Sequence, residues 1–413
     1  MKIWTQTVPH EPAARAAAES MPLKPGVWSL RFGAERLLFS EEAAPAAASR
    51  GARIPSRDED VAREQLHVVV QNGRLFQQHH PEVSVLHDRG RFLLVRLDPE
   101  QAKTLAREAP TCFGVMPAAD DQVIFDERPA ERARAAVPPF VQALVDSVSR
   151  ASLQTNLNAL VAFQTRHSLS AGFTNASAAA RTQLANLGYS TKFQSVTVNG
   201  KPSRNVIADK AGAGAGKRKV FLATAHLDSI NLAGGAAAPA PGADDNGTGS
   251  AGVLEIARVF ASHRAVHDLR LILFGGEEEG LFGSRKYVSS LSAAERARIG
   301  AVVNMDMIGS VNSPSPGVLL EGAALSQSAI DGLAAAAAAF TTLKVQTSLH
   351  PFNSDHVPFI DRNIPAVLTI EGADDTNDRI HSARDTLDGV NADLMLAIVR
   401  MNVGFLAAML GSV

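Results

Sequence analysis

Five groups of acidic residues and histidines stand between Ala223 and Thr386, and they carry the clearest chemical signal in the chain. They are His226 with Asp228, Asp244 with Asp245, Glu277 to Glu279, Asp306, and His381. Imidazole nitrogens and carboxylate oxygens are the ligands that hold Zn²⁺ with an open position for water. The residue types therefore predict a hydrolytic site with two metal ions.

Three of the five groups follow an apolar run. Val220 to Ala225 leads into His226, Leu269 to Phe274 leads through Gly275 and Gly276 to Glu277, and Ala301 to Met305 leads into Asp306. Buried parallel strands consist of such runs, and ligands gather outside their carboxyl ends. Groups that are far apart in the sequence are therefore expected to meet at one edge of a sheet.

The first two groups have both a chemical and an ordinary interpretation. Because His226 and Asp228 are two residues apart on a strand, their side chains share a direction, and Asp228 is placed to accept the second ring N–H of a metal-bound His226. Alone, the pair would fit a protein surface equally well. Asp244 and Asp245 precede a helical segment and could be caps, but one cap does not need two aspartates. A carboxylate here could bridge two cations.

The remaining groups add a base and further ligands. Glu277 to Glu279 could be a solvated helix face, but they follow a buried strand across two glycines. One carboxylate could bind metal while its neighbour accepts a proton from water. A buried Asp306 needs a partner, which a cation would provide. The loop residue His381 is a candidate ligand only because the other four groups are present. Mn²⁺ or Co²⁺ could substitute for Zn²⁺ as the bound metal.

Composition bounds the class of protein. A chain of 413 residues predicts two domains, and 46% hydrophobic with 20% charged residues is ordinary for a globular protein. The formal net charge of −2 offers no basic surface for nucleic acid. The single cysteine, Cys112, cannot form an internal disulfide.

The chain divides into two parts and a connection. Residues 1–130 hold both tryptophans and short strand-like runs, which predict a small α+β domain without catalytic residues. Residues 131–139 read as a linker, and residues 140–413 alternate strands, loops and helices. Ala211 to Gly216 is expected to form a hairpin tip.

No membrane-spanning segment is predicted. The longest apolar stretch, Leu394 to Leu410, has the spacing of an amphipathic helix packed on the sheet. No charged-then-apolar leader precedes Trp4, which fits either a cytoplasmic protein or one whose leader has been removed.

Five motifs together resemble a known family. They are His226-Leu-Asp228-Ser, Asp245-Asn-Gly-Thr-Gly249, Glu277-Glu278-Glu-Gly-Leu-Phe-Gly-Ser, Asn304-Met-Asp306-Met-Ile-Gly, and Ile380-His381-Ser-Ala-Arg-Asp385-Thr386. In this order, over about residues 140–413, they resemble the co-catalytic di-zinc aminopeptidases of metallopeptidase family twenty-eight. The resemblance implies a three-layer α/β/α sandwich around a mostly parallel mixed sheet.

The resemblance also implies roles. His226 and Asp306 would hold one zinc, Glu278 and His381 a second, and Asp245 would bridge them, while Glu277 would be the general base. Asp228, Ser354, Asp355 and Asp385 would support the ligands from behind. The two zinc ions would activate a water that hydrolyses the N-terminal bond of peptides with a free amino terminus, and an extracytoplasmic location would follow if a leader was removed.

The substrate pocket is less defined. Met307, Ile308, Phe352, His356 and Phe359 are candidate walls, which favours apolar N-terminal residues. Some relatives carry a tyrosine at the Ser354-Asp355 segment that stabilises the oxyanion. This chain has none there, so the zinc ions or His356 must take that role.

Three other functions share this fold. A dipeptidase or carboxypeptidase would differ only in pocket residues. A glutaminyl cyclase, which is a single-zinc acyltransferase, would not need both His226 and Asp306. A binding protein like the transferrin-receptor ectodomain would have lost ligands. For residues 1–130 the arginines between Arg128 and Arg134 motivate a cap or prodomain hypothesis, and a stabilising or oligomerising domain is the alternative.

Overall fold

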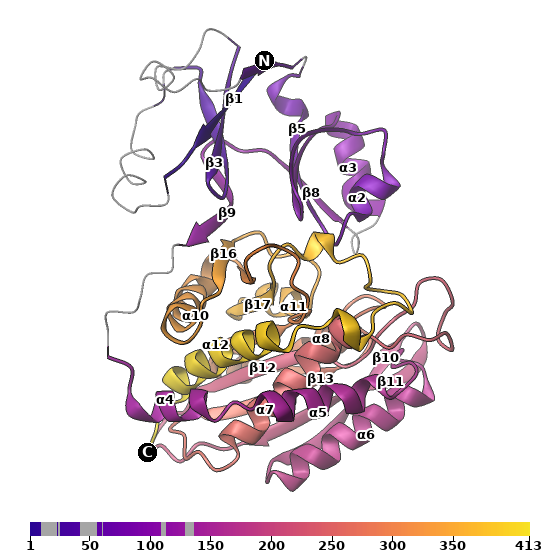
Figure 1. The fold of residues 1–413 in the computed structure, drawn as a ribbon, viewed down its shortest axis with the longest axis vertical. Helices are drawn as coiled ribbons and strands as arrows, with labels where there is room; N and C mark the ends of the chain where they lie inside the picture. The colour runs from indigo at the N-terminus through magenta and orange to yellow at the C-terminus, as the bar shows by residue number, and fades with distance from the viewer. Residues whose placement is uncertain (10–22, 24, 42–55, 60, 109–112, 129–135) are drawn as a thin grey trace. The chain divides into compact units, whose positions relative to one another are not determined.

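The computed structural model describes residues 1–9, 23, 25–41, 56–59, 61–108, 113–128 and 136–413. The chain forms two compact units (Figure 1). The N-terminal unit consists of Met1–Pro129 and Gln346–Asn353, and the C-terminal unit consists of Ala130–Val345 and Ser354–Val413. Cys112 and residues 131–135 of the predicted linker lie outside the described residues, as do the arginines of that linker beyond Arg128.

The C-terminal unit is built around a mixed sheet whose central strands are parallel. The strand order is β10 (Ser190–Val198), β11 (Lys201–Lys210), β13 (Asp268–Phe274), β12 (Val220–His226), β14 (Ile299–Met305), β17 (Ala366–Glu371) and β15 (Gly317–Glu321). Strands β13, β12, β14 and β17 run parallel, while β10, β11 and β15 join antiparallel at the sides. The carboxyl ends of β12, β13 and β14 therefore lie at one edge.

Both faces of this sheet are buried, which produces three layers. In β12, Phe221 and Ala223 belong to the larger core cluster, whereas Leu222 between them belongs to the smaller cluster on the opposite face. This alternation follows the two-residue period of a strand. The central strands are apolar throughout because helices cover both faces of the sheet.

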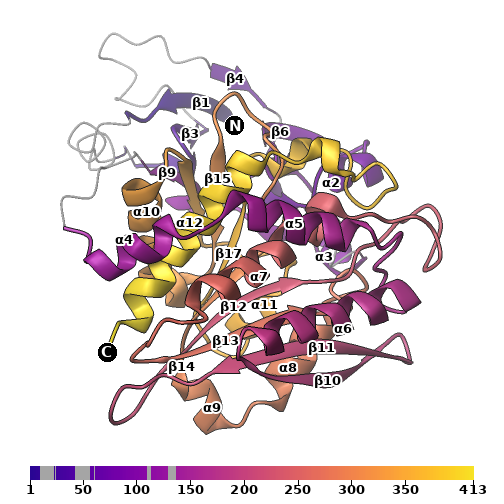
Figure 2. The same ribbon diagram turned by 60° about the horizontal axis from the view of Figure 1, so that its bottom comes forward.

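Helices cover the two faces unequally (Figure 2). The larger cluster contains side chains from α4 (Pro139–Asp146), α5 (Arg150–Val161), α6 (Ala171–Asn186), α7 (Gly249–Phe260), α10 (Gln327–Phe340) and α12 (Ala392–Leu410). The smaller cluster contains side chains from α8 (Phe282–Ser290) and α11 (Val357–Ile360), and α9 (Ala293–Arg298) precedes β14. The predicted three-layer α/β/α sandwich is confirmed.

Helix α12 is the predicted C-terminal helix. Its 19 residues are long and apolar enough to cross a membrane by length and composition, but 67% of that window is buried inside the structure. Leu394, Ile398, Met401 and Phe405 pack in the larger core cluster, as the spacing predicts for a core helix.

One local prediction is wrong. Ala211 to Gly216 is not a hairpin tip, because β13 lies between β11 and β12 and pairs with both. Gly212 instead approaches the neighbouring backbone closely: a Cβ there would stand 2.4 Å from the carbonyl oxygen of Val266. A glycine is required by this close approach.

The N-terminal unit contains two sheets. Strands β9 (Gln122–Arg128), β2 (Trp28–Phe32), β3 (Glu35–Ser40), β1 (Lys2–Thr7) and β4 (Ser56–Asp58) form the first in that order. The second has the order β6 (Ser84–Arg89), β7 (Phe92–Arg96), β5 (Leu66–Gln71) and β8 (Phe113–Pro117), all antiparallel.

With α2 (Leu75–His79) and α3 (Pro99–Glu108), the second sheet has the chain order β-α-β-β-α-β, with β7 inserted between β5 and β6. This is the split β-α-β, or ferredoxin-like, topology. The predicted small α+β domain is confirmed as a separate, strand-rich unit. It also contains Gln346–Asn353, which the prediction assigned to residues 140–413.

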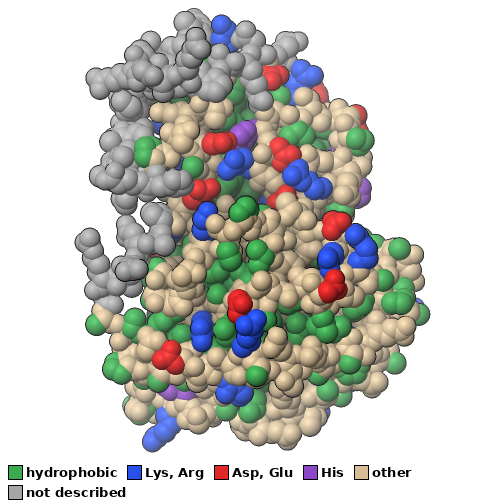
Figure 3. Space-filling model, viewed as in Figure 1, with side chains coloured by type: hydrophobic (Ala, Val, Ile, Leu, Met, Phe, Trp, Pro, Cys, Tyr) green, Lys and Arg blue, Asp and Glu red, His purple; other side chains and the backbone are tan. Residues whose placement is uncertain are grey.

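Charged side chains of both signs are interspersed over the described residues on the face drawn in Figure 3. This agrees with the net charge of −2.

Candidate metal centre

Three strands deliver chemical groups to one edge of the sheet. His226 is the last residue of β12, Asp306 directly follows β14, and Glu277 follows β13 after two glycines. The turn needs both glycines: a Cβ on Gly275 would stand 2.4 Å from the ring of Phe173, and Gly276 has φ of +79°. Local sequence thus directs Glu277 back toward the ends of the neighbouring strands.

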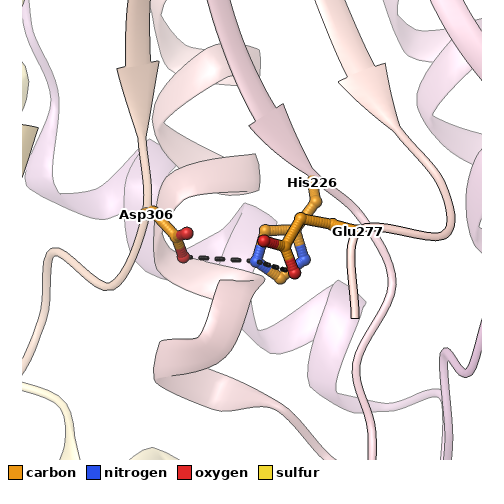
Figure 4. A group of neighbouring side chains, drawn as sticks. All are labelled: His226, Glu277 and Asp306. Atoms are coloured by element: carbon orange, nitrogen blue, oxygen red, sulfur yellow. Dashed lines mark hydrogen bonds and ion pairs between the residues drawn. The ribbon is translucent and has the colours of Figure 1, made fainter. Parts of the chain in front are cut away.

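His226 lies at the centre of the first cluster (Figure 4). Its Nε2 is 3.2 Å from Oδ1 of Asp306, 3.2 Å from Oδ1 of Asp245 and 4.0 Å from Oε2 of Glu277. Its Nδ1 is 3.2 Å from the carbonyl oxygen of Asp228 and 3.7 Å from the carboxylate of that residue. The nearest acceptor for the second ring nitrogen is therefore the Asp228 backbone and not the predicted carboxylate.

Asp245 faces a second histidine with its other oxygen. Its Oδ2 is 3.0 Å from Nε2 of His381, which is also 3.2 Å from Oε2 of Glu278. One carboxylate thus stands between two imidazoles, each of which has a further carboxylate beside it. This is the arrangement that a carboxylate bridging two cations requires.

Asp244 plays a different part. Its Oδ1 accepts hydrogen bonds from the backbone of Gly309 and from Thr248, and its Oδ2 accepts one from Asn377. Its oxygens are therefore engaged with the protein, and of the two adjacent aspartates it is Asp245 that faces the histidines.

Asp385 supports this loop from behind. Its Oδ1 accepts a hydrogen bond of 2.9 Å from the backbone N–H of Asp244, and its Oδ2 accepts one of 3.0 Å from that of Asp245. Asp228 has a similar task, since its Oδ2 accepts the backbone N–H of Glu278. Both residues accept backbone N–H groups of the loops that carry Asp245 and Glu278.

Ser354 contacts a candidate ligand directly. Its hydroxyl donates a 2.7 Å hydrogen bond to Oδ2 of Asp306 and accepts one of 2.9 Å from Asn304. The adjacent Asp355 is fully buried, and burial raises its pKa to about 7. Ser354 therefore orients Asp306, whose other oxygen faces His226.

Arg166 is a residue that sequence reasoning missed. Its guanidinium is fully buried and donates to the carbonyl oxygens of four residues. These are Leu160, Leu227, Pro241 and Gly242. Burial lowers its pKa to about 10, while nearby carboxylates, Asp385 first, oppose that shift. It stays a cation beneath the Asp245 loop, and nothing in the sequence around residue 166 separates it from an exposed loop arginine.

Glu279 was part of the acidic run, yet it interacts elsewhere. Its Oε1 accepts a 2.6 Å hydrogen bond from Ser168 and lies 3.2 Å from Nδ1 of His167. Burial, together with the charge of Asp228, raises its pKa to about 8. Three adjacent glutamates thus face three different partners.

Two of the predicted pocket residues pack in the core on opposite faces of the sheet. Ile308 is fully buried in the larger core cluster, and Phe359 is fully buried against Phe274 and Tyr287 in the smaller one. His356 is fully buried, with Nε2 3.5 Å from Oε1 of Glu321. Met307 is also buried, and Phe352 belongs to the N-terminal unit. Ile308 and Phe359, which lie near candidate ligands in the sequence, thus pack in the protein core, because both faces of the sheet are buried.

The electrostatics of the cluster suit a cation. Burial raises the pKa of Glu278 to about 7, with the charge of Asp245 adding to it. Burial also raises the pKa of Glu277 well above its ordinary value, although the charge of His226 opposes this. For Asp245 burial acts in the same sense, but hydrogen bonds from both histidines prevail and lower its pKa.

The donor atoms fit a metal as well. Ligand atoms of His226, Glu277 and Asp306 lie within 4.8 Å of one another, as do those of His226, Asp245 and Glu278. Oε1 of Glu278 and Oδ1 of Asp228 are buried without a hydrogen-bond donor among the described residues. Buried carboxylates without donors are costly, and a divalent cation removes that cost.

Part of the chain is similar to known peptidases. Residues 205–406 match the family model described as "Peptidase family M28". Leupeptin-inactivating enzyme 1 of Streptomyces exfoliatus is 36% identical over 196 residues, which cover 46% of this chain and 40% of that protein. Aminopeptidase YwaD of Bacillus subtilis is 30% identical over 197 residues, covering 46% and 41%. Leucine aminopeptidase 2 of Trichophyton rubrum is 31% identical over 176 residues, covering 41% and 34%.

Solved structures share the fold. The LapA aminopeptidase of Legionella pneumophila matches 84% of this chain and 98% of its own, with a TM-score of 0.60 and 20% identity. The zinc aminopeptidase BSAP of Bacillus subtilis matches 66% and 96%, with a TM-score of 0.54 and 16% identity. The aligned part of this chain spans about two-fifths of the first curated relatives.

Proposed function

We propose that this chain is a metal-dependent aminopeptidase with two zinc ions, because residues 205–406 match the model of peptidase family M28 that the sequence motifs resemble. The observation that carries the proposal is the position of Asp245, whose two oxygens face His226 at 3.2 Å and His381 at 3.0 Å. The names of the relatives, which include aminopeptidases, support the same activity.

The residues divide into two ligand sets. His226, Asp306 and Oδ1 of Asp245 would hold one cation, and His381, Glu278 and Oδ2 of Asp245 the other. When bound, two such cations would lower the pKa of a water molecule and polarise the scissile carbonyl group. Mn²⁺ or Co²⁺ would satisfy the same nitrogen and oxygen donors.

Glu277 is the proposed general base. Its carboxylate lies 4.0 Å from the ring of His226, beside the first ligand set and not inside it. It would take the proton of the attacking water and deliver it to the amine that leaves when the peptide bond breaks. Its raised pKa suits a group that must both accept and return a proton near neutral pH.

The proposed substrate is a peptide with a free amino terminus. The site gathers carboxylates, which attract an ammonium group, and the chain offers no basic surface for nucleic acid by composition. The preference for an apolar N-terminal residue is supported by the name of the Trichophyton relative and not by the predicted pocket walls.

Glu277→Gln tests the proposal. Hydrolysis of leucine p-nitroanilide should fall by about 10²- to 10⁴-fold, because proton transfer is lost, while zinc content stays at the wild-type value. Glu279→Gln is the matched control, since it makes the same change two residues later on a side chain that contacts Ser168. An undiminished rate in Glu277→Gln would refute the role of the base.

The second measurement concerns the substrate end. An N-blocked leucine p-nitroanilide should not be cleaved, whereas a dipeptidase or carboxypeptidase would act on other ends. A glutaminyl cyclase is the alternative with structural support, since that of Porphyromonas gingivalis shares the fold with a TM-score of 0.53. Cyclisation of N-terminal glutamine with one zinc per chain would favour that alternative.

A further inference from the structure

The backbone of the candidate ligand His381 has an unfavourable conformation. His381 lies in a turn and has φ of +55°, in the left-handed region. A residue other than glycine costs about 1–3 kcal/mol there, and such a conformation persists only where the surrounding structure maintains it. The imidazole Nε2 is nevertheless placed 3.2 Å from Glu278 and 3.0 Å from Asp245. Contacts from other segments must therefore hold the backbone of His381.

The loop that follows β12 makes such a contact. The backbone N–H of Leu232 donates a 3.1 Å hydrogen bond to the carbonyl oxygen of His381. This loop begins just after His226, so one segment leaves a ligand of the first set and reaches the backbone of a ligand in the second. We call residues 229–242 of this loop the clasp.

One side chain closes the clasp. Residues 233–243 are all alanine, glycine or proline, so Asn231 is the only residue from 231 to 243 whose side chain can form a hydrogen bond. Its amide donates a 2.7 Å hydrogen bond to the carbonyl oxygen of Pro239, and its Oδ1 accepts the backbone N–H of Ala233 at 3.0 Å. Asn231 is buried and lies directly before Leu232. It therefore fixes the segment whose N–H reaches His381.

The ends of the clasp are fixed inside the C-terminal unit. The hydroxyl of Ser229 donates a 2.7 Å hydrogen bond to the carbonyl oxygen of Ala240. The buried guanidinium of Arg166 donates to the carbonyl oxygens of Pro241 at 2.6 Å and Gly242 at 2.7 Å. Because both ends are held, the bonds of Asn231 decide the position of the part between them.

From these contacts we propose that Asn231 is a positioning residue for the second candidate zinc site. Asn231 closes the clasp and so fixes Leu232. The N–H of Leu232 then holds the carbonyl oxygen of His381 and maintains the left-handed turn that directs the imidazole to its place in the ligand set. The inference rests on the proposed metal site and adds to it a residue that contacts no candidate ligand with its own side chain.

The arrangement predicts an unequal effect on the two ligand sets. His226 ends β12, and its carbonyl oxygen accepts a 2.6 Å hydrogen bond from Ser250. Asp306 accepts one of 2.7 Å from Ser354. These contacts do not involve the clasp. Because partners behind a ligand change metal affinity by about 10- to 100-fold, an opened clasp should weaken zinc binding by the set of His381 about tenfold and change the other set less than about twofold.

The test measures each ligand set by zinc titration of the metal-free full chain, in competition with a chromophoric chelator. The background His226→Ala leaves the set of His381, and the background His381→Ala leaves the set of His226. Asn231→Ala should weaken zinc about tenfold in the first background but less than about twofold in the second, because the clasp acts through His381. Asn186→Ala is the matched control, since it makes the same substitution on an exposed residue at the end of α6 and should change neither affinity.

Hydrogen exchange tests the clasp without zinc. The amide of Leu232 should exchange at least about tenfold faster in Asn231→Ala than in the wild type, because an open loop exposes its hydrogen bond to water. The amide of Ala243, which donates to the carbonyl oxygen of Asp385 at 3.1 Å, should keep its wild-type rate. If Asn231→Ala does not fold, Asn231→Ser carries both measurements, because a serine hydroxyl can accept a backbone N–H two residues on but is too short to replace the amide donor.

Two results would overturn the inference. The first is a folded Asn231 variant with the wild-type exchange rate at Leu232 or the wild-type zinc affinity in the His226→Ala background. The second is equal weakening of zinc in the two backgrounds. A wild-type chain that binds no zinc would instead refute the proposed function, and the exchange rate of Leu232 would still decide whether Asn231 closes the clasp.

Discussion

Asp385→Asn is the change that most directly tests how the protein shapes its metal centre. The two oxygens of Asp385 accept the backbone N–H groups of Asp244 and Asp245 at 2.9 and 3.0 Å, and the side chain is buried. An asparagine offers one acceptor oxygen and one NH₂ donor. One of the two backbone N–H groups must then lose its acceptor and face another donor.

The magnitude follows from that lost bond. A hydrogen bond to a charged group contributes about 1.5–3 kcal/mol, and a buried N–H without an acceptor costs about 1–3 kcal/mol. Taking about 2–3 kcal/mol for the loop, with about 1.4 kcal/mol per factor of ten, zinc affinity should fall about 30- to 150-fold. Because Asp245 faces both histidines, the affinity of the site for both zinc ions should be weakened.

Chelator competition on the metal-free protein measures both affinities. Asp388→Asn is the matched control: it makes the same substitution three residues later, on an exposed aspartate that pairs with Arg379. Its zinc affinities should equal those of the wild type. If Asp385→Asn also binds both ions as tightly as the wild type does, then Asp385 does not organise the Asp245 loop.

Three further outcomes are expected. Removal of metal with a chelator should abolish hydrolysis of leucine p-nitroanilide, and Zn²⁺ should restore it; activity that survives complete metal removal would contradict the proposed function. Burial opposes protonation of both site histidines. The charges of Asp306 and Glu277 nevertheless raise the pKa of His226 well above its ordinary value, and the charges of Glu278 and Asp245 raise the pKa of His381 in the same way. Both rings should hold a proton at pH 7 without metal, and each ligand set contains one ring, so zinc uptake should release at least two protons, and the affinity for each ion should fall at least about tenfold per pH unit below pH 7. Calorimetry in two buffers of different ionisation enthalpy counts those protons, and a count near zero would show that the rings are neutral. Arg166→Lys keeps the charge but cannot donate to four carbonyl groups, so the free energy of unfolding in urea should fall by about 2–4 kcal/mol, against little change for the exposed Arg181→Lys.

The strands and their ends could be predicted because one rule governs both. A parallel strand buried on two faces must be apolar throughout, so β12, β13 and β14 are visible as runs, and the polar residue that ends each run must lie at the open edge. This rule was sufficient to predict that His226 and Asp306 lie at that edge. The hairpin prediction failed because β13, which comes later in the chain, inserts beside β11.

The residues that hold the loops of the candidate ligands could not be predicted from the sequence in the same way. Arg166 acquires its importance from four carbonyl groups that lie up to 76 residues away, and no local pattern marks them. The same holds for Ser348, which donates a hydrogen bond to the carbonyl oxygen of Ile124, 224 residues earlier. Phe352 is a further example, because the sequence suggested a pocket wall and did not indicate that its ring lies over Gly114.

Metal binding, protonation of the buried carboxyl groups and folding of the C-terminal unit are linked equilibria. Burial raises the pKa of Glu278, Asp355 and Asp385 to about 7, so near neutral pH these carboxyls hold protons for part of the time when no metal is bound. Arg166 is the buried guanidinium near them, and it is already committed to backbone carbonyl groups. Two divalent cations would favour the ionised carboxylates and displace those protons. Metal uptake should therefore stabilise the C-terminal unit more strongly as pH rises toward 8, and a zinc-induced increase in Tm that shrinks over that range would contradict this coupling.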